Sequence, residues 1–131
     1  MPSAWEGQNF GGLIAALRKH GTGVMAVRVF AAGVLATDIR TGRESAQYEN
    51  ADISTEESRA RAVFDILGDD HGTRAQTAVR FCLANPDIDV VNVGVFDTAQ
   101  LEEAVEAADR GPLPAEAIQA LAPLYAENFK M

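Results

Sequence analysis

Two segments of the chain are almost wholly apolar and rich in β-branched residues. Residues 24–30 carry one charge, and residues 88–93 end directly before Gly94. Apolar runs of this kind are typical of strands that are covered on both faces, as in a parallel sheet. The pattern therefore predicts two strands, and the helices predicted between them favour a parallel arrangement.

Around these strands, apolar residues recur every three or four positions, which is the spacing of an amphipathic helix. Gly21 closes the first helix, Ser54 with Glu57 forms a capping box at the second, and Pro114 precedes the last. The polar residues 38–52 predict a surface loop. The predicted helices cover residues 12–20, 54–67, 73–84, 97–109 and 115–128.

The second predicted strand leads through Gly94 directly into a helix. Asp97 stands at the N-cap position and Gln100 follows three residues later, as in a capping box. The free N–H groups at such a helix start lie beyond the carboxyl end of the strand and suit an anion, such as a cofactor phosphate. This unit predicts a nucleotide-binding α/β fold. Two strands are too few for a stable sheet, so we expect further strands to be needed.

Composition narrows the classes of partner. The chain has 131 residues, 47% of them hydrophobic, and a formal net charge of -8. This acidity argues against nucleic acid and anionic membranes as partners, and no apolar run approaches the roughly 20 residues of a membrane span. The first residues lack the basic and apolar regions of a secretory signal. The single cysteine, Cys82, fits a reducing compartment and a packing role, so we expect a soluble, cytoplasmic protein.

Several segments, taken in order, resemble one family. Residues 21–35 look like a seventh barrel strand with its loop, residues 75–86 like the helix before the last strand, and residues 90–109 like the eighth strand and its helix. Within the last segment, Gln-Leu-Glu-Glu at 100–103 is the most specific piece, and residues 109–113 resemble the sugar-dehydrogenase-like branch. The chain thus resembles the C-terminal part of the aldo/keto reductases, (β/α) barrels that reduce carbonyls with a nicotinamide cofactor.

The resemblance implies a partial (β/α)8 TIM barrel made of the last two βα units plus a C-terminal helix. Residues 1–131 are then a single incomplete domain, because such a barrel needs about 250 residues. The family's catalytic aspartate, tyrosine, lysine and histidine belong to the first half of the barrel and have no counterpart here. We therefore expect no catalytic residue and no hydride transfer from the chain alone. The alternative is a non-catalytic fragment that self-associates or docks with a missing half-barrel.

The resemblance also implies where NAD or NADP would lie. The end of the seventh strand packs on the nicotinamide and pyrophosphate, although valine replaces the family's usual stacking aromatic ring at residue 27. The eighth strand and the following helix hold the adenosine. Residues 94–100 include no basic side chain, and Asp97 would repel a 2′-phosphate but can accept from a ribose hydroxyl, which favours NAD over NADP. The expected cofactor-binding residues are Val27, Arg28, Val29, Phe30, Ala31, Gly94, Val95, Phe96, Asp97, Gln100 and Glu103.

Structural roles stay open for several of these residues. Asp97 can serve only as an N-cap, Gly94 can serve only a tight turn, and Glu103 can be a solvated helix charge. Arg28 lies within an apolar predicted strand, and a buried arginine needs a partner. It either points into the ligand end of the barrel or pairs with a carboxylate from an element of the barrel that is absent from this sequence.

The remaining polar residues give no further site. His20 and His71 have no ligand spacing between them, so no metal site is predicted. Tyr48 has no matching lysine beside it, and Tyr125 lies on an apolar helix face with Ile118. Both tyrosines are expected to be structural.

Overall fold

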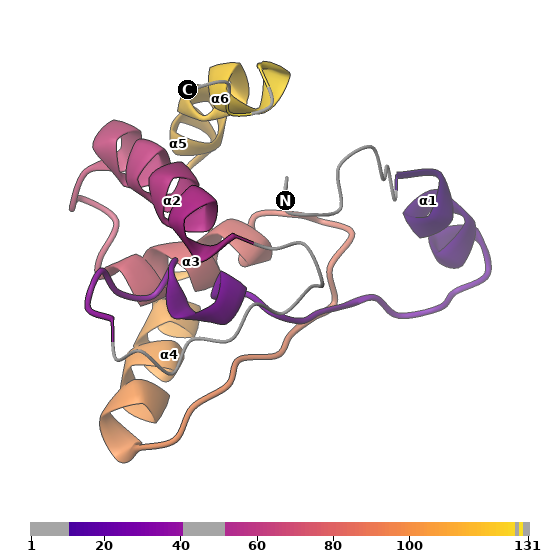
Figure 1. Cartoon of the computed structure of the whole chain (residues 1–131). Coiled ribbons are helices and arrows are strands. Elements are labelled where there is room, and N and C mark those ends of the chain that lie inside the picture. Colours follow the sequence, from indigo (N-terminus) through magenta and orange to yellow (C-terminus); the bar gives the residue numbers. More distant parts are fainter. Residues whose placement is uncertain (1–10, 41–51, 128, 130–131) are drawn as a thin grey trace.

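The computed structural model describes residues 11–40, 52–127 and 129 (Figure 1). None of the helices in these ranges is both long and apolar enough to cross a membrane. In chain order the elements are α1 (Gly11–Lys19), β1 (Met25–Ala26), the 3-10 helix η1 (Ala31–Gly33), α2 (Ile53–Leu67), α3 (Arg74–Leu83), β2 (Val90–Val91), α4 (Thr98–Arg110), α5 (Ala115–Ala120) and α6 (Ala122–Ala126).

The two strands form a parallel sheet, as the sequence predicted. Met25 lies opposite Val90 and Ala26 lies opposite Val91, and the backbone N–H of Asn92 donates to the carbonyl of Ala26 at 2.9 Å. Each strand has only two residues, so the predicted spans 24–30 and 88–93 were too long. The predicted parallel orientation is nevertheless correct, because both strands run in the same direction and are connected through helices.

The first strand ends early because the backbone turns at Arg28. This residue has a φ of 59°, and Ala31 and Ala32 follow with φ values of 45° and 59°. A left-handed residue cannot continue an extended strand. The chain therefore leaves the sheet and folds into η1. Arg28 is exposed, so the expectation of an arginine buried within a strand was wrong.

One core cluster joins the sheet to α3 and α4. Thr73 caps α3 in a reciprocal capping box with Gln76, and its hydroxyl also donates to Glu103 Oε1 at 2.6 Å. The amide of Gln76 donates to Glu106 Oε2 at 2.9 Å, so two polar bonds cross between the helices. Buried Val29, Ala78, Val79 and Ala107 form the cluster, with Phe30, Leu35, Cys82, Leu83, Val91 and Val93 packed against it.

A second cluster packs α2, α5 and α6 together. Its buried members are Leu67, Leu113, Ala117 and Leu121, with Val63, Phe81, Ala84, Ile118 and Leu124 packed against them. The predicted single helix over residues 115–128 is two short helices that meet at Leu121. Pro123 lies in the first turn of α6, and its lack of an N–H group removes the hydrogen bond that would continue α5. Ile118, expected on the apolar face of this segment, packs in this cluster together with Leu121 and Leu124.

The start of α2 differs from the prediction. The carboxylate of Asp52 accepts from the backbone N of Ser54 at 3.0 Å, from its Oγ at 2.7 Å and from Thr55 Oγ1 at 2.9 Å. These bonds hold the pKa of Asp52 below its ordinary value. Asp52 therefore caps the helix, and the predicted Ser54–Glu57 capping box is wrong. Residues 41–51 of the predicted loop, with Tyr48, lie outside the described residues.

Arg80 forms hydrogen bonds to two connections between helices, the α2–α3 turn and the α4–α5 connection. Its guanidinium donates to the carbonyls of His71 at 2.7 Å, Gly111 at 2.9 Å and Pro112 at 3.2 Å. The first carbonyl belongs to the α2–α3 turn and the others to the α4–α5 connection.

Gly72 in the α2–α3 turn has a φ of +103°, and a Cβ there would meet the Gln76 side chain. The turn therefore requires glycine.

Asp89 attaches α1, which lies apart from the other helices in Figure 1, to the start of β1. Its carboxylate accepts from the backbone N of Val24 at 2.7 Å and from Arg18 Nη1 at 2.9 Å. These bonds, the Val24 bond first, hold the pKa of Asp89 below its ordinary value of 3.8.

We expect this attachment to weaken in acid. Because the folded pKa of Asp89 is lowered, its contribution is complete above the unfolded value and is lost as the pH falls through the folded pKa. A carboxyl NMR titration should place the midpoint of Asp89 below 3.8. Arg18→Ala should raise that midpoint without reaching 3.8, because the Val24 bond remains. An unchanged midpoint in this variant would contradict the assignment.

Candidate functional site

The carboxyl ends of β1 and β2 lie at one edge of the sheet, because the strands are parallel and in register. Two segments leave this edge, residues 27–31 after β1 and residues 92–97 after β2. In Figure 1 the two segments diverge. The first leads to η1 beside α3, and the second leads to the start of α4, which lies at the end of that helix away from the sheet. The two predicted groups of site residues therefore begin at one edge and then separate.

The group after β1 is divided between surface and core. The side chain of Val27 is 58% exposed, and Arg28 is also exposed. Val29 is buried and Phe30 packs against it in the first core cluster, while the half-buried Ala31 begins η1. Val27 and Arg28 are thus the members of this group with the most surface open to a ligand.

The group after β2 surrounds the start of α4. Asp97 caps the helix, and its carboxylate accepts from the backbone N of Gln100 at 2.8 Å. The Gln100 side chain accepts in turn from the backbone N of Phe96 at 3.2 Å. The reciprocal bond reaches the residue before the cap, so this arrangement is a shifted capping box. Gly94 and Val95 are exposed, and the Phe96 ring is 92% exposed.

Glu103 lies further along α4 and has a structural partner. It is half-buried and accepts from the Thr73 hydroxyl at the start of α3. The alternative of a solvated helix charge is therefore wrong. This bond holds the start of α3 against α4.

The start of α4 suits the neutral part of a nucleotide better than a phosphate. The N–H groups of Phe96 and Gln100 already donate to side chains, and the Asp97 carboxylate would repel an anion. A carboxylate can accept from ribose hydroxyls, and an exposed aromatic ring can stack on adenine. The residues present therefore fit an adenosine whose ribose carries no 2′-phosphate.

A polar cavity that the sequence did not predict lies beside η1 and α2. Arg40 Nε pairs with Glu57 Oε1 at 2.5 Å, and Arg74 Nη2 lies 3.8 Å from Asp38 Oδ2. The cavity has a volume of ≈ 250 Å³ and is lined by Val34, Asp38, Arg40, Glu57, Ala60, Arg61 and Arg74. Its residues come from three separate segments, so no local pattern indicated it.

The other candidates occupy structural positions. His20 follows α1 in a turn and His71 lies in the turn before α3. Over the ranges that the structure describes, no group of three or more His, Cys, Asp or Glu side chains is placed to hold a metal ion. Burial raises the pKa of the Cys82 thiol, and partial burial raises the pKa of Tyr125, which is 36% exposed, to about 12. The Tyr125 ring lies 6.4 Å from that of Phe81, and Cys82 packs against the first core cluster. These contacts agree with the structural roles predicted for Tyr125 and Cys82.

Parallel strands that alternate with helices place the chain in the α/β class, and a partial barrel is consistent with its two-stranded sheet. The family model described as Aldo/keto reductase family matches residues 5–126. The chain belongs to this family, which has a TIM-barrel fold and oxidoreductase activity and generally uses NAD(P)H. A search of the curated proteins gives no match to the chain.

Proposed function

We propose that this chain is the cofactor-side, C-terminal part of an NAD(P)-dependent aldo/keto reductase of the sugar-dehydrogenase-like branch. One observation carries the proposal: the register of β1 and β2 brings their carboxyl ends to a single edge, and residues 92–97 lead from this edge to the exposed start of α4. In a (β/α) barrel, ligands bind at that edge of the strands. The reaction served is carbonyl reduction or the oxidation of a sugar or alcohol by hydride transfer.

The residues that follow the two strands would bind and orient the cofactor. Asp97 would accept from the ribose hydroxyls, and the Phe96 ring would stack on the adenine. Gly94 is exposed and lets the backbone approach the dinucleotide closely, while Val27 and Arg28 would lie toward the nicotinamide. The bound cofactor supplies or accepts the hydride. The family's catalytic aspartate, tyrosine, lysine and histidine have no counterpart in this chain, so we expect no turnover from it alone.

Asp97→Ser tests the choice of cofactor. Serine keeps the N-cap but removes the carboxylate, so the affinity for NAD should fall about tenfold, the typical effect of losing a hydrogen bond to a charged group. The affinity for NADP should not fall, because the repulsion of the 2′-phosphate disappears. Calorimetric or NMR titration of the full chain measures both.

The wild-type chain is the matched reference for this experiment. It should bind NAD more tightly than NADP, and its thermal stability should be close to that of the serine variant. Equal affinities of the wild type for the two dinucleotides would contradict the role of Asp97. Turnover of NADH with a panel of aldehydes above the buffer rate would contradict the expected inactivity.

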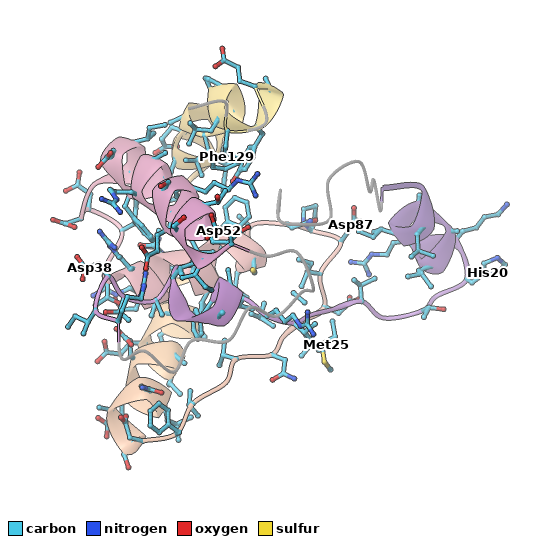
Figure 2. The ribbon with its side chains drawn as sticks, viewed as in Figure 1. His20, Met25, Asp38, Asp52, Asp87 and Phe129 are labelled. Carbon is cyan, nitrogen blue, oxygen red and sulfur yellow. The ribbon has the colours of Figure 1, made fainter. Side chains whose placement is uncertain are left out.

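A second candidate is a non-catalytic fragment that self-associates or docks with a half-barrel. The sheet face turned away from α3 carries exposed Met25, Val27 and Val90, and Figure 2 shows the side chain of Met25 standing clear of the helices. Such an apolar face and the open strand edges favour association. Size-exclusion chromatography with light scattering should then show a dimer or larger species. A monodisperse, folded monomer would contradict self-association.

A further inference from the structure

An apolar cavity lies between α2, α3, η1 and the C-terminal segment. Its volume is ≈ 70 Å³. Its walls come from separate parts of the chain: Val29, Ala31, Val34, Leu35, Glu56, Arg59, Ala60, Val63, Phe64, Leu67, Thr77, Ala78, Phe81, Cys82, Leu121, Tyr125 and Phe129. Most of these side chains are hydrophobic, so the cavity favours apolar matter over water.

Thr77 is the polar exception within this wall. Its side chain is 2% exposed, and its Oγ1 atom has no hydrogen-bond partner among the described residues. Buried hydroxyls are almost always hydrogen-bonded, and each exception calls for an explanation. A ligand with one hydroxyl or carbonyl group in the cavity would supply the partner that Thr77 lacks.

The two charged side chains in the cavity wall, Glu56 and Arg59, form an ion pair. Arg59 Nη1 pairs with Glu56 Oε1 at 3.2 Å, and the guanidinium carbon lies 5.9 Å from the centre of the Phe129 ring. Phe129, labelled in Figure 2, lies beside α2 and the last helices. A charged ligand would find no unbalanced partner in the apolar interior, so the occupant should be neutral.

The volume limits the size of the occupant. A cavity of ≈ 70 Å³ is roughly half the size of one of about 150 Å³ that binds benzene. A ring is therefore too large, and only a short chain fits, with its end extending through the side of the cavity that is open to solvent.

We propose that this cavity binds a small neutral amphiphile, a short aliphatic alcohol or ketone, whose oxygen bonds to the Thr77 hydroxyl while its carbon chain packs between α2 and α3. The cavity shares Val29 and Ala31 with the segment expected to bind the cofactor, but Thr77 and the walls from α2 and α3 lie outside that segment. The proposal can therefore hold or fail whether or not the chain binds NAD.

The probes are 1-butanol and pentane, which have nearly the same shape and differ in the hydroxyl group. Methyl NMR spectra of the full chain report binding through the buried side chains of Val34 and Leu121. Both probes should shift these signals in the wild type. In Thr77→Val, which keeps the side-chain shape, 1-butanol should bind about tenfold more weakly, and pentane should bind as before.

Two further variants complete the test. Thr77→Ser retains the hydroxyl and should retain butanol binding, while Ala60→Leu should fill the cavity and abolish binding of both probes. The absence of shifts at these methyl groups with either probe would overturn the proposal. Equal butanol affinity of the wild type and Thr77→Val would also overturn it.

Discussion

Leu121→Ala is expected to lower the free energy of unfolding by about 3–5 kcal/mol. Leu121 is 1% exposed at the junction of α5 and α6, and it packs with Leu67, Leu113 and Ala117 in the second core cluster. Its side chain also lines the apolar cavity. Truncation would therefore enlarge a void that already exists, and the surroundings would have little material with which to fill it. Urea unfolding followed by circular dichroism measures the loss.

Leu101→Ala is the matched control for this prediction. Leu101 is a leucine on α4 that is 52% exposed, so the same truncation removes much less buried surface. Its effect should be about 1 kcal/mol or less. Similar losses in the two variants would contradict the assignment of Leu121 to the core.

Arg80→Met is expected to cost about 2–4 kcal/mol, because hydrogen bonds from a charged donor contribute more than neutral ones and unpaired carbonyls carry a penalty. Arg80 is half-buried and donates to the carbonyls of His71, Gly111 and Pro112. Methionine keeps the apolar length of the side chain and removes all three bonds. The α2–α3 turn and the α4–α5 connection should then loosen together, which hydrogen exchange of their amides can detect.

Arg80→Lys separates the effect of the charge from the effect of geometry. A lysine ammonium lacks the planar fork of donors, so it cannot reach three carbonyls in two separate connections. Its stability should lie between those of the wild type and the methionine variant. A methionine variant as stable as the wild type, with unchanged exchange in both connections, would contradict the account.

The sequence predicted the helices well because their determinants are local. Helix α1 (Gly11–Lys19) and helix α4 (Thr98–Arg110) lie within one residue of their predicted bounds. Apolar spacing, caps and glycine stops are properties of neighbouring residues, and they act alike in most folds. The parallel pairing of the two strands also followed from the alternation of strand and helix.

The strand lengths could not be predicted in the same way. An apolar run such as residues 24–30 is compatible both with a buried strand and with a chain that turns into a core. The left-handed Arg28 and the burial of Val29 decide between these possibilities, and both depend on packing against α3. The cap of α2 was missed for a different, local reason: the backbone N and the hydroxyl of Ser54 both donate to the Asp52 carboxylate, so Ser54 is a partner of the cap and not the cap itself.

At the candidate site, the sequence predicted the cap but could not reveal the tertiary contacts. The role of Asp97 as the N-cap is confirmed by its bond to Gln100, and its contact with a cofactor stays a prediction. Other roles depend on segments that are distant in the sequence. Glu103 accepts from Thr73, Arg80 donates to Pro112, and Thr77 lines a cavity whose other walls come from separate helices. Only the three-dimensional fold brings such residues together.

The central claim is that the start of α4 forms the adenosine end of a dinucleotide site. It is tested most directly by titrating the isotope-labelled full chain with millimolar NAD and recording its amide spectrum. The account predicts saturable shifts centred on Gly94, Phe96, Asp97 and Thr98, and a loss of those shifts in Phe96→Ala. An unchanged spectrum at these amides, or shifts confined to other parts of the chain, would contradict it.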